Sequence, residues 1–208
     1  KRADRDPVIF SDAGDNPGGG GSGRTTELLA ALVEAGAEDV LYGSFFRPGL
    51  AEAAHRAGVG VMIDVTFNRD DPNAFDRPLT VTAEVLALGD GDVTGRLGLY
   101  AGRRLQLGPS AALRIGGVAV VVISARAQTA DPVFFEMLGL DIAQARTVVV
   151  KSRGHFRAGF APWFASDRVF EVDTAGLTSP VLDRFDWQGL KRPVYPLDPG
   201  TAWQPPDW

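Results

Sequence analysis

In the first third of the chain, the pattern of hydrophobic and polar residues is typical of strands that alternate with helices. An apolar run precedes a glycine-rich segment and an amphipathic run follows it, which is the order strand, loop, helix. The elements predicted here are strands over Val8–Ser11, Asp39–Gly43 and Val59–Phe67, and helices over Thr25–Ala35 and Gly49–Ala57. Apolar strands that alternate with helices indicate a parallel sheet with helices on both faces.

The rhythm changes between residues 78 and 124 to that of antiparallel strands. Leu79–Leu88 alternates apolar and polar residues, and Gly116-Gly117 separates two apolar runs as a hairpin turn would. We expect this section to be either an inserted sheet or an extension at the edge of the first one. The predicted fold class is therefore α/β, with a mainly parallel sheet, helices on both faces and an antiparallel section.

The α/β rhythm returns after residue 130. The elements predicted there are a helix over Asp131–Leu138, a strand over Thr147–Lys151, a partly helical segment over Gly154–Ser166, a strand over Arg168–Val172 and a short helix over Ser179–Phe185. Residues 191–208 hold five prolines, so we expect an extended tail along the surface. The whole chain, 1–208, is predicted to be one domain. Because it has no initiator methionine and enters a strand almost at once, we expect it to be a fragment of a longer protein.

Composition supports a buried core and limits the classes of partner. About 45% of the 208 residues are hydrophobic, and the net charge of −5 comes from well-mixed acids and bases. No basic stripe indicates nucleic acid, and no apolar run reaches the roughly 18 residues that span a membrane. The absence of cysteine excludes disulfides and thiolate metal sites, which fits a cytoplasmic protein and leaves the periplasm open.

Candidate chemistry lies where the predicted parallel strands end, because ligands of open α/β sheets bind outside the carboxyl ends of the strands. The rule selects the loops 12–24, 68–71, 124–131, 152–157 and 173–176. The candidate site residues at this edge are Asp12, Asp15, Asn16, Gly18, Gly19, Gly20, Ser124, Arg126, Lys151, Ser152, His155, Phe156 and Arg157.

The glycine-rich loop allows a nucleotide- or anion-binding interpretation. Gly18-x4-Gly23-Arg24-Thr25 matches a phosphate-binding loop except that arginine replaces the lysine. The missing lysine and the nearby carboxylate of Asp15, which would repel phosphate, count against this alternative.

A complete metal site within this chain is not expected. Its two histidines are His55, predicted to face solvent at a helix end, and His155. His155 with Asp12 or Asp15 would supply two or three ligands, without the histidine spacing of zinc sites.

A series of motifs resembles the C-terminal domain of the microcystinase C family of zinc metallopeptidases. The resemblance covers about Val8–Asp198. The motifs are Asp12-x-x-Asp15-Asn16-Pro17-Gly18-Gly19-Gly20, Gly58-Val59-Gly60, Gly108-Pro109-x-Ala111-x-Leu113-Arg114-x-Gly116-Gly117-Val118, Ser124-x-Arg126-x-Gln128, Val150-Lys151-Ser152-x-x-His155-Phe156-Arg157-Ala158 and Arg192-Pro193-x-Tyr195-Pro196-Leu197-Asp198.

The resemblance implies half of a hydrolase. Family members are about twice as long, and their zinc ligands lie in an N-terminal domain that this chain lacks. That domain would be the partner of this chain, zinc the cofactor and a peptide or amide the substrate, and this chain alone would be inactive. His155 would donate a proton or a hydrogen bond to the tetrahedral intermediate formed at zinc.

The sequence allows two roles for several of the other candidate residues. Arg126, Lys151 and Arg157 either bind a substrate carboxylate or form structural ion pairs with acids such as Asp12, Asp15 or Asp131. Asp15-Asn16 either lines the site or holds the shape of the loop. A structural or dimerising domain, and hence a homo-oligomer, is the third alternative to a hydrolase or an anion-binding domain.

Overall fold

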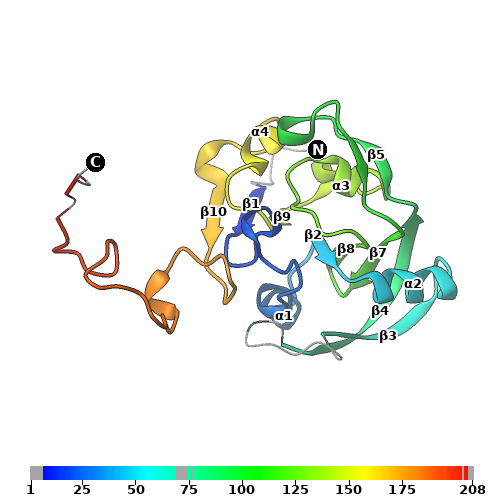
Figure 1. Cartoon of the computed structure of the whole chain (residues 1–208). Helices are drawn as coiled ribbons and strands as arrows, with labels where there is room; N and C mark the ends of the chain where they lie inside the picture. Colours follow the sequence, from blue (N-terminus) through cyan, green and yellow to red (C-terminus); the bar gives the residue numbers. More distant parts are fainter. Residues whose placement is uncertain (1–6, 69–74, 76, 203, 206–208) are drawn as a thin grey trace.

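The computed structural model describes residues 7–68, 75, 77–202 and 204–205. The strands in that part of the chain are β1 (Val8–Asp12), β2 (Val40–Phe46), β3 (Met62–Phe67), β4 (Leu79–Gly89), β5 (Asp92–Thr94), β6 (Arg104–Gln106), β7 (Ser110–Ile115), β8 (Val118–Ile123), β9 (Thr147–Val150) and β10 (Val169–Val172). Eight of them form one sheet in the order β10-β1-β9-β2-β8-β7-β4-β3, and β5 and β6 form a small second sheet. The predicted α/β class is confirmed (Figure 1).

Helices cover both faces of the large sheet. The α-helices are α1 (Glu27–Glu34), α2 (Pro48–Ala57), α3 (Val133–Glu136) and α4 (Phe156–Phe160), and the 3-10 turns are η1 (Pro17–Gly19), η2 (Gly98–Tyr100), η3 (Ile142–Gln144), η4 (Ser166–Arg168) and η5 (Leu182–Arg184). α1 and α2 pack into one apolar cluster, and α3 and α4 into the cluster on the other face (Figure 1). None of the described helices is long and apolar enough to cross a bilayer.

The parallel half of the sheet places the candidate loops. β1 pairs in parallel with β9 and β10, and β2 pairs in parallel with β9 and β8. β8 and β9 are rich in valine and almost wholly buried, as expected for parallel strands covered on both faces. Ser11 lies opposite Val150, so Asp12 and Lys151 follow at the same level of the sheet.

The antiparallel section is also confirmed, and it extends the edge of the main sheet. β7 and β8 form the hairpin predicted at Gly116-Gly117, where Gly116 has φ 56°, and β4 pairs antiparallel with β7. β5 and β6 stand apart as the two-stranded sheet.

The prediction of a third parallel strand over Val59–Phe67 is wrong. β3 begins at Met62, pairs antiparallel with β4 and is last in the sheet order. Val59, Val61 and Met62 are 60%, 42% and 59% exposed. The long apolar run therefore belongs to an edge strand, where one side of the strand meets solvent.

The helix expected over Ser179–Phe185 is also wrong, because the structure has only η5 in this stretch. Ser179 is buried, and its hydroxyl donates to Asp173 Oδ1 at 2.7 Å and accepts from Val181 N. It anchors a turn to the loop after β10 instead of starting a helix.

The Pro-rich tail is described for residues 191–202 and 204–205. It is largely exposed and forms turns, in which the Arg192 guanidinium pairs with Asp198. Figure 1 shows this segment projecting away from the sheet.

Candidate functional site

The loops at the carboxyl ends of the parallel strands meet at one edge of the sheet. Lys151 after β9 contacts the first loop, and Thr174 after β10 donates to Asp12 Oδ1 at 2.5 Å. Arg126 after β8 donates to the Gly21 carbonyl at 2.8 Å. The candidate loop 68–71 follows β3, which is antiparallel to its neighbour, so the rule that selected this loop does not apply to it. It is described only at Asn68, whose amide donates to the Arg24 carbonyl at 2.8 Å, and residues 69–71 lie outside the described part of the chain.

Lys151 is the centre of a buried ionic cluster. Its Nζ lies 3.0 Å from Asp12 Oδ2 and 2.9 Å from Asp15 Oδ2, and it donates to the Thr25 carbonyl and hydroxyl. The lysine and Asp12 are wholly buried, and the Nζ lies 4.9 Å from the Phe45 ring centre. Burial alone would lower the pKa of Lys151, but the adjacent carboxylates raise it above its ordinary value, so the amine stays charged. This geometry favours the structural ion pair over a substrate-binding lysine.

Asp15 joins the cluster to the glycine loop. Its Oδ1 accepts from Gly23 N at 2.7 Å, and its Oδ2 accepts from the N–H and hydroxyl of Thr25. Burial raises the pKa of this carboxyl, but the charge and hydrogen bond of Lys151 and the two backbone N–H donors outweigh it and lower the pKa to about 2. Asp15 is therefore a charged support that holds the loop closed.

Asn16 shapes the start of the loop, as an Asx side chain does. It caps η1: its Oδ1 accepts from Gly18 N at 3.0 Å, and its carbonyl accepts from Gly19 N and Gly21 N. Gly20 has φ 102°, a left-handed conformation that a side chain would strain.

The loop offers little to an anion. Its donors already have partners within the loop: these are the N–H groups of Gly18, Gly19, Gly20, Gly21, Gly23, Arg24 and Thr25. A phosphate-binding loop needs such groups aimed at the ligand. Here the carboxylate of Asp15 accepts two of them, so the geometry disfavours the nucleotide- or anion-binding alternative.

His155 is the exposed member of a polar group built on the loops after β8 and β9. It precedes α4, and its Nδ1 lies 3.0 Å from Gln128 Nε2. Gln128 and Ser152 are buried, and the Ser152 hydroxyl donates to Gln128 Oε1 at 3.3 Å. An added Cβ on Gly18 would lie 2.5 Å from the same Oε1, so the glycine loop closes directly over Gln128.

The remaining candidates lie apart from this group. The Ser124 hydroxyl donates to the Pro109 carbonyl. Phe156 is wholly buried in the core, where it packs beside a small, mainly apolar pocket of about 170 Å³ and away from Gln128 and His155. Arg157 is exposed and pairs with Glu171 at 2.9 Å. Arg126 is exposed beside the glycine loop.

Gln128, Thr25 and Thr174 belong to these networks although they were not among the candidate residues. Gln128 does stand in the Ser124-x-Arg126-x-Gln128 motif, so the sequence offered a reason to count it among the candidate site residues. Thr25 stood in the Gly18-x4-Gly23-Arg24-Thr25 pattern, where it was considered only for phosphate binding, and Thr174 stood in no motif. The fold brings their hydroxyls to Lys151 and Asp12.

The described residues do not fit a zinc site. Among them, no group of three histidine, cysteine or acidic side chains could hold a metal. Asp12 and Asp15 are engaged by Lys151, and His55 is tied to the Ser110 carbonyl through its Nε2 at 3.0 Å. His55 therefore links α2 to β7 while its ring remains exposed, which refines the prediction that it faces solvent.

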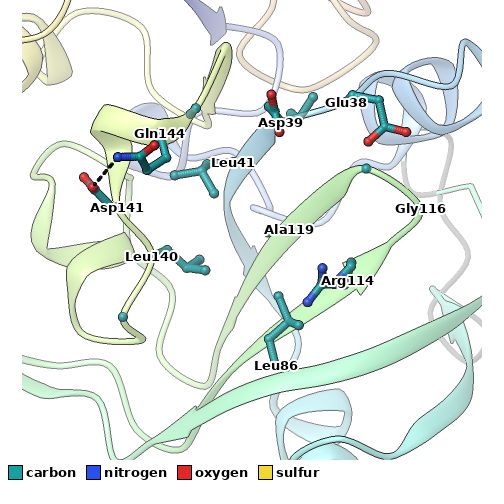
Figure 2. Close-up of a pocket in the computed structure, with 14 residues that line it drawn as sticks. Glu38, Asp39, Leu41, Leu86, Arg114, Gly116, Ala119, Leu140, Asp141 and Gln144 are labelled. Carbon is teal, nitrogen blue, oxygen red and sulfur yellow. Dashed lines mark hydrogen bonds between the residues drawn. The ribbon is translucent and has the colours of Figure 1, made fainter. Parts of the chain in front are cut away.

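A pocket of about 430 Å³ lies at the opposite end of the sheet (Figure 2). It is formed by the start of β2, the β7–β8 turn and the segment around η3, where Gln144 donates to Asp141. None of the candidate site residues lines it. The candidate site residues therefore lie at the loop edge, where the polar side chains converge, and not at this pocket.

Comparisons with known proteins identify the family of the chain. Residues 10–189 match the family model described as MlrC C-terminus. The chain is 31% identical over 160 residues to Microcystinase C from Sphingomonas sp., which covers 77% of this chain and 31% of the relative. It also matches a solved structure of a candidate metallopeptidase from Mesorhizobium sp. BNC1, with TM-score 0.80 and 27% identity over 98% of this chain and 40% of that one. The chain thus spans well under half the length of both relatives.

Proposed function

This chain belongs to the MlrC C-terminus family, and we propose that it is the C-terminal part of a zinc-dependent hydrolase that cuts peptide or other amide bonds. The names of the relatives support the reaction class, since one is Microcystinase C and the other a candidate metallopeptidase. Within the fold, one observation supports the proposal most directly: the exposed imidazole of His155 contacts the buried side chain of Gln128 at the loop edge.

The zinc ligands are proposed to lie in a further, N-terminal domain. The described residues do not supply a ligand set, and both relatives are much longer than this chain. In this proposal the loop edge of the sheet faces that domain, and the 208 residues alone have no turnover.

His155 is proposed to act on the scissile amide. Its ring is exposed, and its Nδ1 is held by Gln128, which leaves Nε2 for the substrate. From there Nε2–H would donate a hydrogen bond to the carbonyl oxygen as negative charge develops on it.

Arg126 is the better candidate for binding a substrate carboxylate. It uses Nη1 for the Gly21 carbonyl, and a guanidinium has five N–H donors, so further donors remain at the exposed edge. Arg157 would first have to leave Glu171. Asp12, Asp15 and Lys151 are proposed to support the loop instead of touching substrate.

A docking role is compatible with this proposal. Large apolar side chains are exposed in the edge strand β10 and in the segment that leaves the sheet after it. They are Phe170 in β10, and Leu177, Val181, Trp187, Leu190 and Tyr195 after it. Such side chains are typical of a surface that another domain or subunit covers.

The test is histidine replacement in the full-length protein. His155→Ala should lower turnover of a susceptible peptide about 100-fold and leave the zinc content unchanged. The matched control is His55→Ala, because His55 lies on α2 and its Nε2 is engaged by the Ser110 carbonyl. Steady-state hydrolysis of a peptide panel, with metal analysis of each protein, gives both readouts. Unchanged turnover in His155→Ala would remove His155 from the chemistry.

A further inference from the structure

The side chain of Gln128 bridges the interior and the exposed histidine. It lies in the loop after β8 and is 6% exposed. Its Nε2 lies 3.0 Å from His155 Nδ1, and its Oε1 lies 3.3 Å from the Ser152 hydroxyl and 3.3 Å from the same Nδ1. Which end of the amide faces the ring decides which ring nitrogen carries the proton.

The buried hydroxyl of Ser152 decides the orientation of the amide. Ser152 is wholly buried, and a buried hydroxyl needs an acceptor for its proton. Gln128 Oε1 is positioned to be that acceptor. Oε1 therefore faces Ser152, and Nε2, which is also the nearer atom, faces His155.

We propose that Gln128 is a positioning residue that holds neutral His155 in the Nε2–H tautomer. Because Gln128 donates to Nδ1, that nitrogen must present its lone pair, and the ring proton lies on Nε2. The catalytic meaning of this tautomer rests on the proposed hydrolase function, in which Nε2–H is the donor to the substrate. The tautomer itself does not depend on that function.

The glycine loop acquires a specific task in this arrangement. A Cβ on Gly18 would fall 2.5 Å from Gln128 Oε1 and 2.6 Å from its amide carbon, so any side chain there would displace the amide. Gly18 has no left-handed φ, so close approach, and not backbone conformation, excludes a side chain at this position. The loop thereby clamps Gln128 against Ser152 and fixes the direction in which the amide donates.

The experiment is nitrogen NMR of the 208-residue chain with 15N-labelled histidine. At a pH where the imidazoles are neutral, long-range proton–nitrogen spectra should show a protonated Nε2 and a bare Nδ1 for His155. Gln128→Glu should invert this pattern, because a carboxylate accepts from both Ser152 and the ring and cannot donate. The control Gln106→Glu adds the same charge at an exposed position in β6 and should leave the pattern unchanged.

The wild-type spectrum alone can overturn the proposal, if the proton is on Nδ1. An unchanged pattern in a folded Gln128→Glu variant would overturn it as well. In the full-length protein the same variant should lower kcat on the order of 10–100-fold. A protein that shows the tautomer but hydrolyses no amide would refute the proposed function and leave the positioning role intact. An active enzyme with the Nδ1–H form would refute only the positioning role.

Discussion

Replacing the buried Lys151 should destabilise the protein, because its charge neutralises two buried carboxylates at the loop edge. We expect Lys151→Met to lower the free energy of unfolding at pH 7 by about 3–5 kcal/mol, the usual cost of removing one partner from a buried ion pair. Methionine fills a similar volume beside the Phe45 ring, so the loss is electrostatic and not a cavity effect. What remains is two carboxylates, on Asp12 and Asp15, buried without their cation.

Part of this magnitude follows from the pKa of Asp15. The difference between its ordinary value of 3.8 and about 2 corresponds to roughly 2 kcal/mol of stability. Because the folded pKa is lowered, this contribution is present above about pH 4 and is lost as the pH falls toward 2. Without Lys151, burial should raise the pKa of Asp15 instead. The variant should therefore lose stability as the pH rises through 4, where the wild type gains it.

Urea unfolding followed by tryptophan fluorescence between pH 2 and pH 7 measures both effects. The matched control is Lys191→Met, since Lys191 is exposed in the tail and should change the free energy by less than about 0.5 kcal/mol. A Lys151→Met protein within about 1 kcal/mol of the wild type at pH 7 would refute the buried cluster. If the variant does not fold at pH 7, its recovery of structure at pH 3 becomes the decisive reading.

Two further predictions test parts of the fold that the sequence did not reveal. Met62→Lys should change the free energy of unfolding by less than about 0.5 kcal/mol because Met62 is 59% exposed, whereas Val65→Ala in the same strand should cost about 1–3 kcal/mol; a large effect of the lysine would mean that β3 is covered. Gly176→Ala should cost about 2 kcal/mol or more because its Cβ would overlap the Gly14 carbonyl, and Gly154→Ala, with open space, should be neutral; equal unfolding midpoints for the two would contradict this close approach.

The pattern of hydrophobic and polar residues predicted most elements but not the place of β3 in the sheet. A continuous apolar run reads as a strand buried on both faces, and Val59–Phe67 has that appearance. Its exposure depends on which strands lie beside it, and β4 covers one side only. Residue periodicity describes the faces of a strand, whereas the position of a strand in the sheet depends on partners that are distant in sequence. The fold class survived this error because the parallel strands β1, β9, β2 and β8 carry the core.

The meeting of the candidate loops could be predicted, because parallel strands end at one edge of a sheet. The different roles of the side chains in these loops could not be predicted. Lys151 and His155 stand four residues apart in one motif, yet one is wholly buried and the other exposed. The strand end directs Lys151 inward to Asp12 and Asp15, while the following turn brings His155 to the surface at the start of α4.

The same contrast explains why the glycine loop resembles a phosphate-binding loop without the geometry of one. Both need bare backbone between a strand and a helix, so both produce runs of glycine. In a phosphate-binding loop the N–H groups point at a ligand. Here Asp15 is an internal anion that takes the N–H groups of Gly23 and Thr25 and is itself neutralised by Lys151. These contacts hold the loop from within the protein. Gly18 packs directly against the Gln128 amide. In the proposed role of Gln128, Gly18 therefore serves the orientation of His155, and the loop would constrain the geometry of the proposed reaction without binding the reacting group.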